Sequence, residues 1–299
     1  MNYALHLLIY FNLYAILALS LNVVVGYCGL LTLAHAGYYA LGAYTYALLT
    51  QVVGLGFVPA AMGSMIVPAV LSLAVSLPAW RFKGDFFVMT SLAVQAFLFS
   101  VLHNWFNSAA PLGSWANLTN GPFGISGIPH PTILGYQLNT IDSMAALSLG
   151  IFGLSAFIFW RLKRSPWGRL LKAMRDDELA ARGLGKNTRL AKVQAFAIAC
   201  AFAGLAGVIY ASYVSYIDPS SASLDESILM LSMLLVGGAG NFRGPLVGAA
   251  VLLAIPEILR LASIPDAVAA NLRLLAYGLL LVVMMHSRPQ GLSGEYRVR

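Results

Sequence analysis

"RSPWGRLLKAMRDDELAARGLGKNTRLAK", residues 164–192, is the charged centre of an otherwise apolar chain. It holds 8 of the 18 lysines and arginines and 3 of the 11 acidic residues, whereas residues 1–80 contain no Asp, Glu, Lys or Arg. Across the 299 residues, 59% are hydrophobic and only 10% are charged, against about 25% charged in soluble domains. The composition therefore predicts an all-α, polytopic integral membrane protein with a single transmembrane domain over residues 1–299.

A helix that crosses the bilayer needs about 20 mostly apolar residues. The apolar stretches of this kind are residues 4–25, 30–50, 57–79, 85–102, 141–160, 193–213 and 268–286. A longer apolar stretch, 227–259, is interrupted by "GGAGNFRGP" at 237–245, whose glycines and proline predict two crossings instead of one. The expected total is about nine transmembrane helices, within a range of about eight to ten.

The distribution of basic residues predicts which loops face the cytoplasm, because cytoplasmic loops carry an excess of Lys and Arg. Residues 161–192 hold 10 of the 18 lysines and arginines, so this loop is expected inside. No Lys or Arg occurs from Asp85 to Trp160, so the 103–140 loop is expected outside. This pattern places the N-terminus outside and the C-terminus in the cytoplasm, with Arg260 as an exception. Such loops also explain the basic pI, so no nucleic-acid binding is expected.

Two glycine-rich stretches interrupt the predicted helices, "GYCGLLTLAHAGYYALGAY" at 26–44 and the break at 237–245. Backbone groups freed from a helix find no partner in lipid, so such stretches are buried in protein or line a wet cavity. Each stretch is therefore either a site of close helix packing or part of a translocation pathway. We expect the two to meet at mid-membrane around a small, mostly apolar cavity. The candidate pathway residues are Asn22, Thr32, His35, Gly37, Gly238 and Gly240.

His35 lies deep within the stretch that lacks charged residues. An ionisable side chain in the membrane indicates function by default. The alternative is a neutral imidazole that forms a hydrogen bond with a neighbouring helix, and the sequence leaves both open. Asn22 and Gln95, which also lie within predicted spans, are typical of hydrogen bonds between helices and less so of substrate ligands.

The chain lacks the usual signatures of catalysis. "GLGKN" at 183–187 has a Gly-Lys pair but lacks the glycine spacing and the hydroxyl residue of an ATP-binding loop. The five histidines, at 6, 35, 103, 130 and 286, include no pair at the i, i+4 spacing of a helical metal site. We therefore expect a protein that is not an enzyme and that holds no metal or cofactor of its own.

The charged stretch predicts a helical hairpin. Ser165 and Pro166 are typical of the N-cap and first turn of a helix. Apolar residues then recur at helical spacing: Trp167, Leu170, Leu171 and Met174. A second helix through "DDELAARGLG" is expected to end at Gly183 or Gly185. An amphipathic hairpin of this kind binds either anionic lipid headgroups or a protein groove, and the acidic "DDE" favours a protein partner.

This loop resembles the cytoplasmic loop of permease subunits of branched-chain amino acid ABC importers, the LivM type. Four further stretches match that family in the same order: "LALSLNVVVGYCGLLTLAHAGYYALGAY", "TNGPFGISGIP", "GGAGNFRGPLVGAAVLLAIPEILR" and "LRLLAYGLLLVVMMHSRPQGL". The resemblance covers most of the chain. Two departures from the family pattern, Asn120 and the run Asn241-Phe242-Arg243, bear on the substrate more than on the class of transporter.

The resemblance implies that loop 161–192 is a coupling loop, whose short helix docks into a groove of a cytoplasmic ATPase. The implied coupling residues are Trp167, Arg175, Asp176, Asp177, Glu178, Ala180, Ala181 and Gly185. It also implies the partners: a second homologous permease chain, two ATPase subunits that carry ATP and Mg, and a periplasmic substrate-binding protein, all at a bacterial inner membrane.

The function that the resemblance implies is inward transport of a small polar solute, most often a branched-chain or other amino acid, by the permease subunit of an ATP-binding cassette importer. The alternatives are an ABC permease for urea, short amides or organic acids, and a stand-alone secondary transporter. In a secondary transporter the broken helices would form the ion and substrate site.

Overall fold

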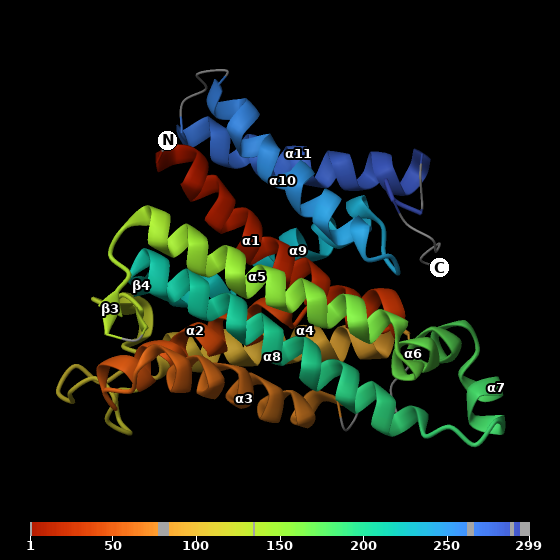
Figure 1. The fold of residues 1–299 in the computed structure, drawn as a ribbon, viewed down its shortest axis with the longest axis horizontal. Helices are drawn as coiled ribbons and strands as arrows, with labels where there is room; N and C mark the ends of the chain where they lie inside the picture. The colour runs from red at the N-terminus through yellow and green to blue at the C-terminus, as the bar shows by residue number, and fades with distance from the viewer. Residues whose placement is uncertain (1, 77–83, 134, 262–265, 288–289, 294–299) are drawn as a thin grey trace.

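The computed structural model describes residues 2–76, 84–133, 135–261, 266–287 and 290–293, which are mainly helical (Figure 1). In chain order the helices are α1 (Asn2–Asn22), α2 (His35–Gln51), α3 (Phe57–Ser76), α4 (Asp85–Asn104), α5 (Ile141–Arg164), α6 (Pro166–Asp176), α7 (Glu178–Gly183), α8 (Thr188–Val214), α9 (Leu224–Gly237), α10 (Arg243–Leu261) and α11 (Asp266–Ser287). Within these ranges, 5 segments are long and apolar enough to cross a membrane: Asn2–Tyr27, Phe57–Ala74, Asp85–Asn104, Ile141–Arg164 and Thr188–Val214. The helical membrane architecture is confirmed, and the count of nine crossings stays a prediction.

The break predicted at 237–245 is present. α9 ends at Gly237 and α10 begins at Arg243. Gly238 and Gly240 adopt φ angles of 106° and 83°, which glycine reaches without the steric cost of a Cβ atom. α9 has 14 residues, so its length is about 21 Å, which is shorter than the roughly 30 Å hydrocarbon core. The apolar stretch is thus divided into one short and one longer helix.

The break after α1 differs from the sequence prediction. α1 continues through a π-helical turn, Val23–Tyr27, and residues 28–34 then leave the helix before α2 begins. The prediction of a continuous span over 30–50 is therefore wrong in its first turn. Backbone N–H groups of the 28–34 loop donate instead to the hydroxyls of Ser91 and Thr32, at 3.0 and 3.2 Å. These hydroxyls replace helical acceptors that the segment has lost.

α2, α3 and α8 pack against one another at backbone distance. A Cβ atom on Gly42 of α2 would lie 2.2 Å from the Cα atom of Gly204 in α8. A Cβ atom on Gly204 would lie 2.1 Å from the carbonyl oxygen of Ser64 in α3. Small residues allow this close approach, which gives membrane helices their van der Waals attraction. The three helices therefore form a tightly packed part of the core.

Short strands occur in two loops. β1 (Ile125–Ser126) pairs antiparallel with β4 (Tyr216–Ile217), and β2 (Thr132–Ile133) pairs antiparallel with β3 (Tyr136–Gln137). In Figure 1 these strands lie at the left, whereas α6 and α7 lie at the right. The 103–140 loop contains three of the strands, and the 161–192 loop contains α6 and α7. These are the two loops for which the charge pattern predicts opposite sides of the membrane, and they lie at opposite ends of the molecule.

Candidate functional site

The hairpin of α6 and α7 is fixed by side-chain caps at both helix starts. Ser165 Oγ accepts a hydrogen bond from the Gly168 N–H at 3.1 Å, and Pro166 occupies the first turn of α6, as the sequence predicted. Asp177 Oδ1 caps α7 by accepting from the N–H groups of Leu179 and Ala180, at 2.8 and 3.0 Å. These caps satisfy amide groups that would otherwise lack partners at the helix starts.

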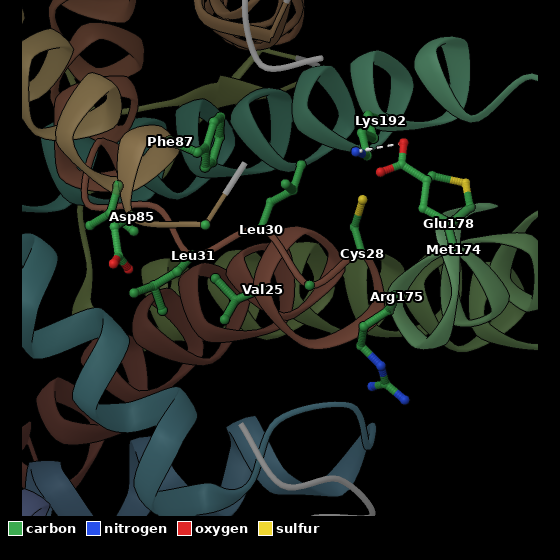
Figure 2. A pocket seen from close by; sticks show the side chains of 13 residues that line it. Val25, Cys28, Leu30, Leu31, Asp85, Phe87, Met174, Arg175, Glu178 and Lys192 are labelled. Atoms are coloured by element: carbon green, nitrogen blue, oxygen red, sulfur yellow. Dashed lines mark ion pairs between the residues drawn. The ribbon is translucent and has the colours of Figure 1, made fainter. Parts of the chain in front are cut away.

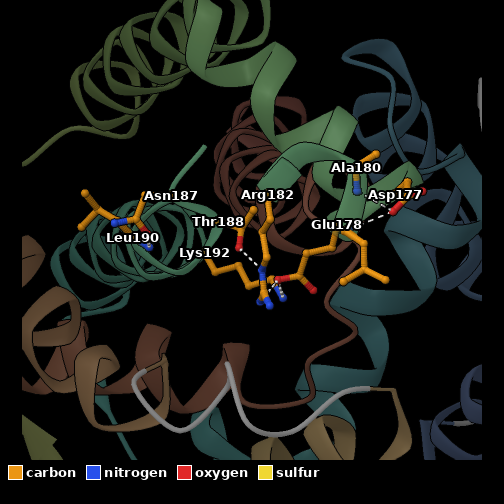
Figure 3. Close-up of polar contacts among 9 residues, drawn as sticks. Asp177, Glu178, Ala180, Arg182, Asn187, Thr188, Leu190 and Lys192 are labelled. Carbon is orange, nitrogen blue, oxygen red and sulfur yellow. Dashed lines mark hydrogen bonds and ion pairs between the residues drawn. The ribbon is translucent and has the colours of Figure 1, made fainter. Parts of the chain in front are cut away.

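Glu178 forms two ion pairs, one within α7 and one that joins the hairpin to α8 (Figure 3). Its Oε1 atom lies 2.7 Å from Arg182 Nη2 and 2.9 Å from Lys192 Nζ. Its side chain is 14% exposed and that of Lys192 is 8% exposed. Burial raises the pKa of the Glu178 carboxyl, but the hydrogen bonds and charges of Lys192 and Arg182 outweigh burial, so its pKa lies below its usual value. Glu178 therefore stabilises the loop within this chain.

The apolar side chains of the hairpin face two ways. Leu171 and Met174 are buried in this chain's own core, so half of the stripe predicted to face a partner does not do so. Other leucines are exposed, with Leu179 at 70% and Leu184 at 80%. Leu190 in the first turn of α8 is 53% exposed. The exposed apolar surface of the loop is therefore formed by α7 and the start of α8.

The remaining coupling candidates divide between these two faces. Ala181 is buried, whereas Asp176, Asp177 and Ala180 are exposed. The last candidates are Gly185, which is exposed with a φ of 73°, and Trp167, which is partly buried and donates through Nε1 to Gln194 Oε1 at 3.0 Å.

Arg175 points from α6 toward the end of the α1 segment. Its Nη1 atom donates to the carbonyl oxygen of Gly26, in the π-helical turn, at 2.6 Å. The arginine side chain is only 9% exposed, and it also contacts Asp176 at 3.2 Å. A Cβ atom on Gly29 would lie 2.7 Å from Arg175 Cγ, so that glycine leaves room for the arginine. The hairpin is thus bonded directly to the first broken segment.

Asn22 bonds the first broken segment to the second. Its Oδ1 atom accepts from the Gly240 N–H at 2.9 Å, and its Nδ2 atom donates to the Asn241 carbonyl at 2.7 Å. Asn241 in turn accepts from Lys163 Nζ at 3.1 Å, at the end of α5. The two broken segments are in contact here through Asn22 and the 240–241 backbone, whereas a mid-membrane cavity around Thr32 and His35 stays a prediction.

Thr32, His35 and Gly37 lie in a different set of contacts. Thr32 Oγ1 accepts a hydrogen bond from the Ala34 N–H at 3.2 Å, within the loop that precedes α2. His35 Nε2 lies 2.8 Å from Ser20 Oγ of α1, and the imidazole is 3% exposed. The Gly37 N–H donates to Gln95 Oε1 of α4 at 2.9 Å. The bonds of His35 and Gly37 join neighbouring helices, and for His35 this is one of the two interpretations that the sequence left open.

A cavity of about 370 Å³ lies between the hairpin and the first broken segment (Figure 2). Figure 2 shows a charged side, with Glu178, Lys192 and Arg175, and an apolar middle, with Val25 and Leu30. The lining residues are Val25, Cys28, Gly29, Leu30, Leu31, Gly84, Asp85, Phe87, Val88, Met174, Arg175, Glu178 and Lys192. Sequence analysis missed Lys192 as a site residue, because its ion pair with Glu178 spans a turn and two helices.

Residues 3–285 match the family described as "Branched-chain amino acid transport system / permease component". The chain belongs to this family. This permease is 34% identical over 303 residues to the Escherichia coli K12 "High-affinity branched-chain amino acid transport system permease protein LivM", which covers 94% of this chain and 67% of the relative. The Salmonella typhimurium LivM protein is 33% identical with the same coverage. The Salmonella paratyphi B "Autoinducer 2 import system permease protein LsrC" is 28% identical over 51% of this permease and 43% of the relative.

The described part of this permease contains no group of three or more His, Cys, Asp and Glu residues arranged to hold a metal ion. The described cysteines, Cys28 and Cys200, are buried and unpaired. The acidic residues of the hairpin are used in helix caps and ion pairs. The chemistry of the site is thus that of hydrogen bonds and ion pairs that join the hairpin to α8 and to the broken segments.

Proposed function

We propose that this permease moves branched-chain or other amino acids inward across a bacterial inner membrane as part of an ATP-binding cassette importer. Its membership of the branched-chain amino acid permease family and its similarity to the LivM proteins support this proposal. LsrC is named as a permease of an autoinducer 2 import system, so a related permease serves a chemically different solute. The alternative substrates for this permease are urea, short amides and organic acids. A stand-alone secondary transporter is less well supported, because the family is one of transport-system components.

The proposed assembly has four kinds of chain. This permease pairs with a second homologous permease, two cytoplasmic ATPase subunits bind ATP and Mg, and a periplasmic protein delivers the substrate. We further propose about nine crossings, with the N-terminus outside and the C-terminus inside. The placement of the strand-containing loops and the hairpin at opposite ends supports this topology.

The structure of the hairpin is the observation that best supports the proposal. Its inner face is fixed to α8 by Glu178 and to the α1 segment by Arg175. Its outer face exposes Leu179 and Leu184, and Asp176 of the same hairpin is exposed as well. An exposed apolar surface rimmed by charge is typical of a protein interface. We assign this outer face to the ATPase.

The inner contacts provide a path for coupling. Motion of the docked hairpin would pull on the Gly26 carbonyl through Arg175, and the Asn22 bonds continue from that turn to Gly240. The pathway candidates Asn22, Thr32, His35, Gly37, Gly238 and Gly240 lie on or beside the segments so joined. The role of the 370 Å³ cavity is then to give the hairpin and the broken turn room to move.

The test is a double substitution, Leu179→Asp with Leu184→Asp, in the complete importer. We expect the ATPase to be lost from the purified complex and leucine uptake to fall to background, because two charges replace the apolar contact. The matched control is Leu179→Met with Leu184→Met, which keeps an apolar surface. A full complement of ATPase in the Asp variant would rule out docking at this face.

The substrate is tested separately in the unaltered importer. Uptake of radiolabelled leucine is compared with uptake of urea and of a short organic acid in the same cells. Saturable leucine uptake that depends on ATP supports the main proposal. Uptake of urea alone would favour the alternative substrate class.

A further inference from the structure

A second groove, on the bilayer side of the hairpin, is not used by the function proposed above. It has a volume of about 460 Å³ and lies between α5, α6 and α8. Its lining residues are Leu162, Ser165, Trp167, Gln194, Ala197 and Ile198. α5 and α8 are both long and apolar enough to cross a membrane. The groove therefore lies where their loop ends meet the headgroup region of the bilayer.

The walls of this groove suit an acyl chain. Leu162, Ala197 and Ile198 are apolar, and none of the lining residues carries a charge. The indole of Trp167 closes one side, held by its hydrogen bond to Gln194 at 3.0 Å. Tryptophan is enriched at this depth of membrane proteins, because its ring is apolar and its N–H is polar.

The lipid-facing surface of α5 continues into the groove. Leu154 and Phe157 are 61% and 60% exposed on this helix. Arg161 lies seven residues after Leu154 and four after Phe157, so the three side chains are on the same side of the helix. Arg161 therefore places a positive charge at the end of this exposed stripe. A lipid that lies along Leu154 and Phe157 therefore meets Arg161 at the level of its headgroup.

Two further arginines, Arg164 and Arg169, flank Ser165 and Trp167 in the chain, and these two residues line the groove. The Arg164 guanidinium lies 4.1 Å from the centre of the Trp160 ring. Arg169 Nη1 donates to the carbonyl oxygen of Arg164 at 3.3 Å. Both side chains are exposed, and residues 161–169 contain no acidic residue. The rim thus has a strong positive charge that no neighbouring residue in this segment neutralises.

We propose that this groove is a binding site for an anionic phospholipid. One acyl chain lies between α5 and α8, and the phosphate contacts Arg161, Arg164 and Arg169. Arginine suits a phosphate because its guanidinium donates two parallel hydrogen bonds. A bound lipid would hold the start of α6 against the ends of α5 and α8. This site is independent of the substrate and of the ATPase partner.

The test uses Trp167 as a reporter in the full-length chain. The other four of the 5 tryptophans are replaced by Phe, and the protein is reconstituted in phosphatidylcholine vesicles. Brominated phosphatidylglycerol or brominated phosphatidylcholine is then added, because bromine quenches a tryptophan that it contacts. We expect phosphatidylglycerol to quench Trp167 at a mole fraction on the order of a hundredfold lower, since each of the three arginines near the surface favours anionic lipid about fivefold.

Substitutions distinguish the effect of the arginine charges from the effect of the apolar groove. Each single change of Arg161, Arg164 or Arg169 to Gln should weaken the preference, and the triple change should abolish it while quenching by phosphatidylcholine persists. Lys186→Gln, at an exposed cation elsewhere in the loop, is the matched control and should leave the preference intact. Ala197→Phe should reduce quenching by both lipids, with an unchanged helical circular dichroism spectrum.

Three results would overturn the proposal. The first is equal quenching by the two lipids in the protein with all three arginines. The second is relief of quenching by inorganic phosphate, which would indicate an ion site that needs no acyl chain. The third is protection of Trp167 from both lipids when the ATPase is added, which would assign the groove to a protein interface.

Discussion

Arg175 illustrates how a single side chain can have a role different from the one its motif suggests. The family resemblance places it in the loop that contacts the ATPase, yet its guanidinium is buried against Gly26. A hydrogen bond from a charged donor to a carbonyl contributes about 1.5–3 kcal/mol. The contact is therefore strong enough to link movement of α6 to the broken end of the α1 segment.

Replacing Arg175 should uncouple transport without releasing the ATPase. Arg175→Gln removes the charge-assisted bond to Gly26, so we expect uptake to fall by about tenfold, in keeping with the loss of such a bond. ATPase recovery in the purified complex should stay normal. Arg175→Lys, which keeps a positively charged donor at this position, is the control and should keep more of the uptake than the Gln variant. Normal uptake by the Gln variant would exclude the proposed link.

Glu178 should make the hairpin sensitive to acid. Because its folded-state pKa lies below the usual value, its contribution to stability is complete above the usual carboxyl range and is lost as the pH falls through the folded-state pKa. Hydrogen exchange of residues 178–186, corrected for the intrinsic rate, should therefore increase on acidification below about pH 4. Glu178→Gln should exchange faster at neutral pH and lose this dependence. An acid response that is identical in both proteins would contradict the assignment.

At the scale of helices, close packing is decided by which glycine faces another backbone. Gly204 lies between α2 and α3, and a Cβ atom there would meet the Ser64 carbonyl at 2.1 Å. Gly248 of α10 approaches the Met233 carbonyl of α9 in the same way, with a Cβ distance of 1.7 Å. Other glycines of the helices, such as Gly150 in α5, have open space at that position.

Substitution should separate these two kinds of glycine. Gly204→Val forces α8 away from α3, so we expect a loss of stability of about 1–3 kcal/mol or more. The measurement is the midpoint of thermal aggregation in detergent. Gly150→Val, in an equally helical position with no neighbour within 4 Å, should change that midpoint little. If both variants lost a similar amount of stability, the effect would come from helix propensity and not from packing.

At the scale of the whole molecule, the two ends differ in charge and structure. One end has the strand-containing loops, and the other has the basic hairpin. The positive-inside rule assigns the hairpin to the cytoplasm. The structure shows that the strand-containing loops and the hairpin lie at opposite ends of the molecule. The assignment of the hairpin to the cytoplasmic side of the membrane rests on charge alone.

Cysteine labelling tests this orientation. The described native cysteines are buried, so a membrane-impermeant thiol reagent should react mainly with an introduced cysteine. Trp115→Cys, at a position that is 82% exposed, should be labelled in intact cells stripped of the outer membrane. Lys186→Cys should be labelled only after the membrane is opened. The reverse pattern would invert the proposed topology.

The sequence by itself determined the features that depend on local pattern. Apolar stretches of membrane length, the break at 237–245 and the caps at Ser165 follow from residue types within one or two helical turns. The order of residues in the charged loop also predicted that it forms two helices. Each of these depends on short-range sterics and hydrogen bonding, which a single segment contains.

Only the tertiary structure decided which side chains meet. Arg175 and Gly26 are 149 positions apart, and Asn22 and Gly240 are 218 positions apart. The apolar period of α6 indicated an amphipathic helix, but it gave no reason why Leu171 and Met174 are buried within the chain instead of facing a partner. Periodicity defines the faces of a helix, whereas the partner of each face depends on how all the other helices fill the remaining space.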